Sequence, residues 1–286
     1  MGETGERRSS LRRAIAVLSA ALLLAVGLAG PVYAGARDML LCLPGFPGTT
    51  VQAQPYIDKM LRHLEDKLGL EARSMSGVFI PDGKDSVAKL KSVQPGLALV
   101  GPSVLAGNHG PMGMKVIARL IIDGKSSEKY SVVVAKGGPS SLEELSGKKV
   151  SGAVVHDEKY VVKVLLGGAV GMGDLQLVSQ RRPLKSLRDV ARGKAAAAIV
   201  DSSVIEHMSE LEFAKDLEII HESDPVPAPA IVLIGQGPAP AKKLKKELVG
   251  MCKRPDGKEL CKTLTVTAIE AASDADYKAL FKRYGK

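Results

Sequence analysis

Residues 86–106 read SVAKLKSVQPGLALVGPSVLA and residues 186–206 read SLRDVARGKAAAAIVDSSVIE, and the two stretches share one pattern. With a shift of 100 positions and no gap, five of the 21 positions are identical, and both copies keep a serine in the turn, Ser103 and Ser203. Each copy predicts a helix, a buried strand, a polar turn and a second helix, as in half of a doubly wound sheet. The repeat therefore predicts two α/β lobes, with chance similarity between apolar segments as the alternative.

Strand-like and helix-like segments alternate along the chain, which favours an α/β architecture with mainly parallel sheets. Apolar residues spaced by three and four positions predict a helix over 51–68, which Gly69 ends. Strands are predicted over 39–43, 97–100, 116–122, 130–135, 150–155, 175–178, 196–200 and 231–234, and further helices over 86–92, 141–145, 159–166, 184–191 and 204–208. From Pro240 onward, the chain is predicted to be helical.

The first 34 residues have the pattern of an export signal. Four arginines at positions 7, 8, 12 and 13 precede an uncharged apolar run over 14–30, and Val32-Tyr33-Ala34 is a small-residue cleavage site. A retained membrane anchor is the alternative, and the arginine pair leaves Sec and twin-arginine export both open. We expect cleavage after Ala34 and a periplasmic product.

Cleavage would leave 252 residues, enough for one large or two modest domains. The formal net charge of the full chain is +9, which indicates an anionic ligand, a membrane surface or nucleic acid as partner. Export excludes nucleic acid, and a solvated helix face explains the lysine-rich run over 242–246. The sequence predicts a monomer that binds a small solute.

Three cysteines follow the predicted signal, in what should be an oxidising compartment. Cys252 and Cys261 are too far apart in a straight helix to bond, but the turn Pro255-Asp256-Gly257 between them lets the chain fold back. We therefore predict a Cys252–Cys261 disulfide. Cys42 lies in an apolar run and is predicted to be a buried thiol.

Several short motifs follow one another along the chain after residue 34. They are Leu43-Pro44 before the helical stretch 56–61, LALVGPS (97–103), YSVVV (130–134), SLEELSGKKV (141–150), the stretch from Gly193 to Asp201-Ser202, and PVPAP (225–229). Their order resembles the phosphate/phosphonate-type extracytoplasmic solute-binding proteins of ABC transporters, which belong to the type II periplasmic binding protein superfamily. LALVGPS is close to the DLAFLGP turn of that family.

The resemblance implies a type II periplasmic-binding-protein fold, in which two crossover strands join two lobes and a hinge closes them around a ligand. The implied first lobe comprises residues 35–128 plus 226–286, and the second comprises residues 129–225. The implied function is delivery of a small polar solute, phosphate- or phosphonate-like if anionic, to an ABC transporter permease in the inner membrane.

Polar turns follow four of the predicted strands, and ligands of open α/β sheets bind beyond the carboxyl ends of strands. Helix starts in such turns offer N–H groups to an anion, whereas N-capping is the alternative role of each Ser or Thr. The predicted ligand-binding residues are Phe46, Thr49, Thr50, Gly101, Pro102, Ser103, His156, Lys159, Tyr160, Asp201, Ser202 and Ser203.

One turn departs from the family pattern. A Ser-Thr-Ser-Gly-like anion cradle usually follows the first strand of the second lobe, where this chain has VVHDEKY (154–160). Asp157 and Glu158 would repel phosphate there, although the neighbouring residues can donate hydrogen bonds. The sequence leaves open an anionic ligand, a cationic or zwitterionic ligand, or loss of transport.

Two other function classes compete with transport. A ligand sensor or envelope scaffold of the same fold would have the same sequence features. An enzyme is disfavoured, because His156-Asp157-Glu158 cannot all face one centre from a strand end and no G-x-S-x-G elbow is present. No catalytic residue, metal site or cofactor is predicted.

Overall fold

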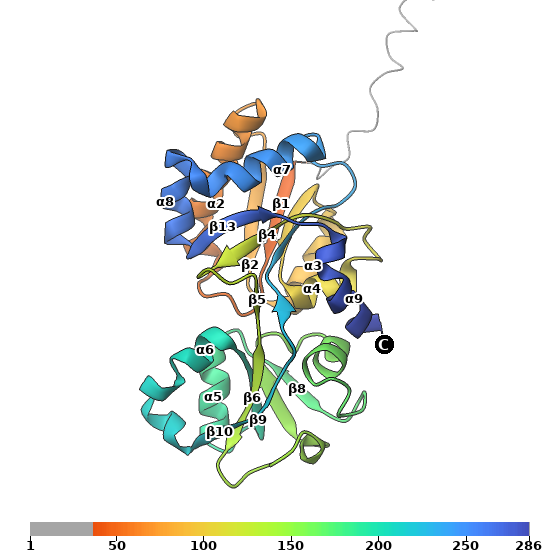
Figure 1. The fold of residues 1–286 in the computed structure, drawn as a ribbon, viewed down its shortest axis with the longest axis vertical. Helices are drawn as coiled ribbons and strands as arrows, with labels where there is room; N and C mark the ends of the chain where they lie inside the picture. The colour runs from red at the N-terminus through yellow and green to blue at the C-terminus, as the bar shows by residue number, and fades with distance from the viewer. Residues whose placement is uncertain (1–36, 286) are drawn as a thin grey trace, which may run out of the picture. The chain divides into compact units, whose positions relative to one another are not determined.

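The computed structural model describes residues 37–285, so the predicted signal segment lies outside the described residues. This part of the chain forms two main sheets. A two-stranded ribbon belongs to the two segments of chain that connect these sheets (Figure 1). The first sheet has the order β13 (Val266–Ala271), β4 (Lys115–Ile122), β12 (Ala230–Leu233), β3 (Leu97–Val100), β1 (Asp38–Cys42), β2 (Ser76–Ile80).

The second sheet has the order β10 (Leu217–Glu222), β6 (Tyr130–Ala135), β9 (Ala197–Asp201), β7 (Lys149–Gly152), β8 (Gln176–Ser179). Both sheets are mixed: β1 pairs in parallel with β2 and β3, β7 pairs in parallel with β8 and β9, and the remaining pairs are antiparallel. The ribbon consists of β5 (Ser127–Glu128) and β11 (Val226–Pro227), which pair antiparallel. The predicted architecture, two α/β lobes joined by two crossover strands, is confirmed, but the prediction of mainly parallel sheets is wrong, because the strands that return from the other lobe and from the C-terminal segment pair antiparallel.

The repeat of residues 86–106 and 186–206 supplies one helix–strand–helix unit to each lobe. The units are α3 (Gly83–Val93), β3 and α4 (Pro102–Asn108) in the first lobe, and α5 (Pro183–Ala191), β9 and α6 (Ser202–Glu206) in the second. The repeated serines Ser86 and Ser186 are both fully buried. The Ser86 hydroxyl donates to the Ile80 carbonyl (3.2 Å) and Ser186 accepts from the Ser151 hydroxyl (3.0 Å). In each copy a serine therefore ties the first helix to a neighbouring strand.

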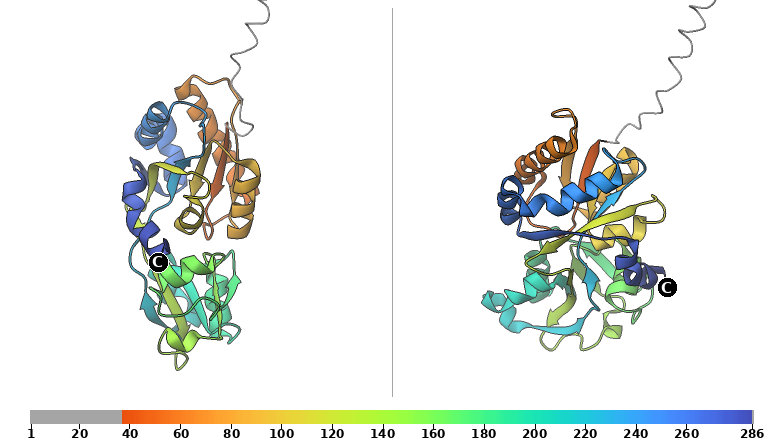
Figure 2. Two further views of the ribbon diagram at one scale, coloured as in Figure 1. Left: turned by 90° about the vertical axis from the view of Figure 1, so that its right-hand side faces the viewer. Right: turned by 45° about the horizontal axis from the view of Figure 1, so that its top comes forward.

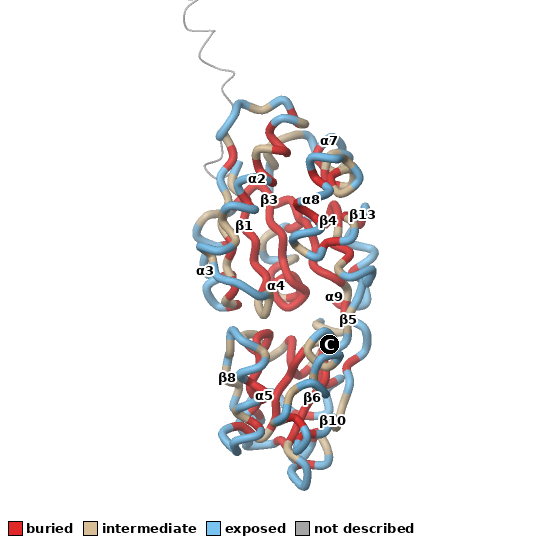
Figure 3. The backbone as a smooth tube through the Cα atoms, turned by 90° about the vertical axis from the view of Figure 1, so that its left-hand side faces the viewer, coloured by how far each residue is buried: buried red, intermediate tan, exposed pale blue. Residues whose placement is uncertain are grey.

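Side chains of the first sheet alternate between two helical layers, as the two-residue period of a strand requires. Met39 and Leu41 of β1 pack in one core with α2 (Thr50–Leu68), α7 (Ala241–Gly250) and α8 (Pro255–Thr263). Leu40 and Cys42 pack in another core with α3, α4 and α9 (Lys278–Gly285). The central strands of both sheets are accordingly among the most buried parts of the described backbone (Figure 3).

The second of these cores continues into the second lobe. It includes Leu280 of α9 together with Tyr160 and Val164 of the wide helical turn η2 (Tyr160–Leu165). Figure 2 shows α9, the last helix of the chain, beside the second lobe. The short turns η1 (Glu143–Leu145), η3 (Met208–Glu210), η4 (Glu212–Asp216), η5 (Met251–Lys253) and η6 (Asp274–Tyr277) complete the described chain.

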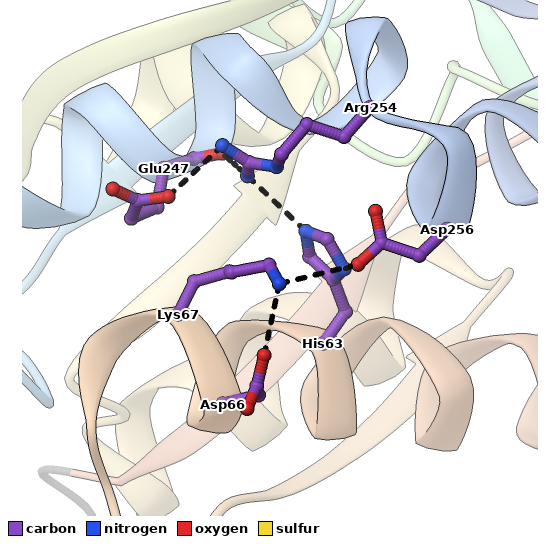
Figure 4. Close-up of polar contacts among 6 residues, drawn as sticks. All are labelled: His63, Asp66, Lys67, Glu247, Arg254 and Asp256. Atoms are coloured by element: carbon purple, nitrogen blue, oxygen red, sulfur yellow. Dashed lines mark hydrogen bonds and ion pairs between the residues drawn. The ribbon is translucent and has the colours of Figure 1, made fainter.

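A polar cluster links α8 to α2 in the first lobe (Figure 4), and a disulfide links α8 to η5. His63 Nδ1 lies 2.9 Å from a carboxylate oxygen of Asp256, and Lys67 Nζ lies 3.4 Å from the same oxygen. The Arg254 guanidinium contacts His63 Nε2 (3.1 Å) and the Glu247 carboxylate (2.9 Å). The predicted Cys252–Cys261 disulfide is confirmed, with its Cα atoms 5.6 Å apart.

The prediction of a fully helical C-terminal segment is wrong. Thr265 takes a left-handed conformation (φ 54°) after α8, and the chain then continues as β13, antiparallel to β4. The strands β2 and β10 were not predicted from the sequence either. Both lie at sheet edges, where β2 has only β1 as neighbour and β10 only β6, so their sequences carry little continuous apolar character.

Removing the disulfide should destabilise the protein. The loop closed by the bond spans nine residues, for which loop entropy gives about 2.5 kcal/mol. We expect the Cys252→Ser/Cys261→Ser variant to melt several degrees lower than the parent in differential scanning calorimetry. Dithiothreitol should lower the melting temperature of the parent and leave that of the variant unchanged; equal sensitivity of both proteins would contradict the assignment.

Candidate functional site

A cavity of about 230 Å³ lies where the carboxyl ends of β1, β3 and β9 meet the connecting strands. The turns after parallel strands of one sheet lie together at the carboxyl ends of those strands, and open α/β sheets bind ligands there. The lining residues come from both lobes and from both connections: Leu43, Pro44, Gly45, Phe46, Pro47, Gly101, Pro102, Ile122, Asp123, Lys125, Ser127, Glu128, Tyr130, Asp201, Ser202, Ser203, Glu206, Ala228, Pro229 and Thr265.

The turn after β1 brings Phe46 to the cavity. Its backbone N–H donates to the Leu43 carbonyl (3.1 Å), and Gly45 between them has a left-handed backbone (φ 89°). A Cβ atom on Gly45 would lie 3.0 Å from the Ala153 side chain of the second lobe. Glycine thus permits both the turn and the close approach of the two lobes.

The turn after β9 is organised by Asp201. Its carboxylate accepts from the Val204 N–H (3.2 Å), which caps α6, and from the Ser203 hydroxyl (2.5 Å). The Ser203 hydroxyl is therefore already engaged, and Asp201 carries the charge at the wall of the cavity.

The connecting strand β5 places a second carboxylate beside the first. Glu128 is half-buried and accepts a hydrogen bond from the Tyr130 hydroxyl (3.0 Å). Burial raises the pKa of Glu128 to about 7; the nearby Asp201 charge adds to the effect and the Tyr130 hydrogen bond opposes it. Burial and the Glu128 charge in turn raise the pKa of Tyr130 well above its usual value.

An exposed ion pair lies at the rim of the cavity, between Lys125 in the turn before β5 and Glu206 of α6. The contact raises the pKa of Lys125 and lowers that of Glu206. Because both side chains are exposed, the pair contributes little to stability, but it joins the connection to the second lobe.

Six of the predicted ligand-binding residues line the cavity: Phe46, Gly101, Pro102, Asp201, Ser202 and Ser203. Three others, Thr49, Thr50 and Ser103, do not line it. Thr49 caps α2, the Thr50 hydroxyl donates to the Phe79 carbonyl (2.9 Å), and the Ser103 hydroxyl is buried without a hydrogen-bond partner among the described residues.

The remaining three predicted residues, His156, Lys159 and Tyr160, belong to a segment that packs against the first lobe. A Cβ atom on Gly83 of α3 would lie 2.1 Å from His156 Nδ1. The Tyr284 hydroxyl of α9 donates to Asp157 (2.9 Å), and Lys159 Nζ lies 4.8 Å from the centre of the Tyr284 ring. Segment 156–160 thus forms much of the contact between the lobes.

Sequence reasoning missed four charged residues of the cavity, namely Asp123, Lys125, Glu128 and Glu206, and also Tyr130. Asp123, Lys125 and Glu128 belong to the segment at the boundary of the two predicted lobes, for which the sequence predicted no ligand contact. Crossover strands in a two-lobed fold run past the ligand cleft, so their polar side chains are candidates on topology alone.

No helix within residues 37–285 is long and apolar enough to cross a membrane. Over the same range, no three His, Cys, Asp or Glu side chains are grouped as metal ligands would be.

The comparisons with known proteins agree with one another. A family model described as "ABC transporter, phosphonate, periplasmic substrate-binding protein" matches residues 49–277. No curated protein sequence matches the chain. Among solved structures, the chain is similar to a binding protein component of an ABC phosphonate transporter from Pseudomonas aeruginosa (TM-score 0.62, 13% identity, 87% of this chain and 85% of that one).

It is also similar to a Prochlorococcus marinus protein in complex with methylphosphonate (TM-score 0.62, 14% identity, 87% of this chain and 97% of that one). An ancestral arginine-binding protein bound to arginine is a more distant match (TM-score 0.52, 18% identity, 81% and 99%). At these identities the likenesses show the fold, which is the type II periplasmic-binding-protein fold.

The contact between Gly83 and His156 is open to a direct test. The Gly83→Ala substitution places a methyl group against the imidazole, so we expect about 1–3 kcal/mol of destabilisation and a larger radius of gyration in solution scattering. The added substitution His156→Ala should restore both quantities. A Gly83→Ala protein as compact and stable as the parent would contradict this arrangement of the lobes.

Proposed function

Since the chain belongs to the family of periplasmic substrate-binding proteins of phosphonate ABC transporters, we propose that the cavity at its crossover strands is where it holds a small solute. The protein is a binding component and not an enzyme. It acts outside the cytoplasm, and its partners are a small-molecule ligand and a membrane permease.

The observation that carries this proposal is the composition of the cavity wall. It combines turns that follow β1 and β3 of the first lobe, the turn that follows β9 of the second lobe, and residues of both connections. A solute in such a cavity contacts both lobes. It therefore binds the closed arrangement of the lobes more tightly than the open one and shifts the equilibrium toward the closed arrangement.

We also propose boundaries for the two lobes, which the strand order of the two sheets supports. We assign residues 35–128 and 226–286 to the first lobe and residues 129–225 to the second, with the hinge in the segments around β5 and β11. We further propose cleavage after Ala34, supported by the sequence pattern of residues 1–34, and a monomeric product.

Filling the cavity should abolish solute binding. Ser202 lines the cavity at the first turn of α6, so Ser202→Phe would occupy the space of the solute without changing a buried core residue. Ser209→Phe, at an exposed position of η3, is the matched control.

The assay is a thermal-shift screen of phosphate, phosphonates, amino acids, amines and quaternary ammonium compounds. A solute at 100 times its dissociation constant stabilises a protein by about 2.7 kcal/mol. We expect at least one compound to stabilise the parent and the control and not Ser202→Phe. Equal stabilisation of all three proteins would place the solute elsewhere.

A further inference from the structure

The charges around the cavity are predominantly negative. Of the lining residues, Asp123, Glu128, Asp201 and Glu206 are acidic, and Lys125 alone is basic. Lys125 is already paired with Glu206. Lys125 also acts on Glu128, but the wall still carries more negative than positive charge toward a solute.

The wall also offers few backbone donors for an anion. Four prolines line it, Pro44, Pro47, Pro102 and Pro229, and proline has no backbone N–H. Pro102 occupies the first position of α4, and the carboxylate of Asp201 caps α6. The two helix starts that could bind an anion are thus occupied by a residue without a donor and by a negative charge.

Glu128 and Asp201 are close enough for their charges to interact, and burial adds to the cost of ionising Glu128. The one hydrogen bond to the Glu128 carboxylate comes from the neutral hydroxyl of Tyr130. Two adjacent carboxylates are costly to ionise together at neutral pH, and a further positive charge placed between them lowers that cost.

Two buried hydroxyl groups beside the cavity also lack partners. Tyr160 is 0% exposed, and its hydroxyl has no hydrogen-bond partner among the described residues. Burial raises the pKa of Tyr160, and the Glu128 charge adds to this effect, so the phenol lies near Glu128. Ser103 is 1% exposed and equally unpaired, and it directly follows the lining residue Pro102. An unmade hydrogen bond of a buried hydroxyl costs about 1–3 kcal/mol, and neither of these two residues lines the cavity itself.

The aromatic side chains of the wall also favour a cationic solute. The chain has four Phe, six Tyr and no Trp, and two of these ten side chains, Phe46 and Tyr130, line this one cavity. Aromatic faces attract organic cations, most strongly where water is excluded.

We infer that the cavity binds a small organic cation, whose positive nitrogen lies between Glu128 and Asp201 and whose carbon groups contact Phe46 and Tyr130. The inference rests on the proposed solute-binding function and names the class of solute. It differs from the anion that the family description suggests, because the site in this chain carries carboxylates and prolines where an anion would require donors.

The test measures binding to the purified chain by isothermal titration calorimetry with three probes: choline, putrescine and methylphosphonate. The first two present a quaternary and a primary ammonium group, and the third is an anion. We expect choline or putrescine to bind, and methylphosphonate to bind at least about 100-fold more weakly than the better cation, because like charges at the site oppose it.

Glu128→Gln keeps the shape of the side chain and removes its charge, so it should weaken binding of the cation by about tenfold or more. Glu222→Gln is the matched control: Glu222 lies on β10 of the second lobe, pairs with the exposed Lys129, and does not line the cavity. The control should bind as the parent does.

The pH profile gives a second readout. The groups that face Glu128 are Tyr130 on β6, Asp201 at the end of β9, Lys125 before β5 and Tyr160 of η2. Because the pKa of Glu128 is about 7 and only its ionised form attracts a cation, affinity should be about tenfold lower at pH 6 than at pH 8. This dependence should disappear in Glu128→Gln.

The outcomes separate this inference from the proposed function. Binding of methylphosphonate with no binding of either cation would overturn the cation inference and leave the solute-binding function standing. Cation binding that Glu128→Gln and pH leave unchanged would also overturn it. Failure of all three probes overturns the inference, and failure of the wider thermal-shift screen as well would overturn the function.

Discussion

The ribbon formed by β5 and β11 is the constraint on which the arrangement of the molecule depends. Its register pairs Val226 with Glu128 and Pro227 with Ser127, and Val226 is fully buried. Two antiparallel strands of two residues each connect sheets of six and five strands. Ser127 and Glu128 of the ribbon also line the cavity, so any motion of the lobes about the ribbon changes the surroundings of Glu128.

Much of the first lobe and of the repeat could be predicted from sequence, because buried strands and the helices beside them have strong periodic patterns. The strand over 97–100 and the helix before it lie where the apolar pattern placed them. The strand β13 could not be predicted, since its residues are half exposed and its partner β4 lies more than 140 positions earlier in the chain. Pairing over that distance leaves no local signature.

The cavity was predictable only in part, for a related reason. Turns after strands, such as Gly101-Pro102 and Asp201-Ser202, can be predicted from their composition. Glu128 does not, because its importance arises from burial and from the proximity of Asp201, and both are products of tertiary structure. Conversely, the carboxylates of segment 156–160 are conspicuous in the sequence, but both form hydrogen bonds within the protein. Asp157 accepts from the Tyr284 hydroxyl, and Glu158 accepts from the Gly173 N–H (2.5 Å).

The position of β12 in the first sheet governs the order in which the molecule can be assembled. β12 lies between β3 and β4, although it follows them by more than 100 residues, and β13 completes the edge later still. All five strands of the second sheet have emerged once residue 222 is synthesised or translocated, whereas the first sheet must wait for residue 271. During vectorial synthesis the second lobe can thus fold as a unit while β3 and β4 are still without the neighbour that separates them, and the first lobe is completed last.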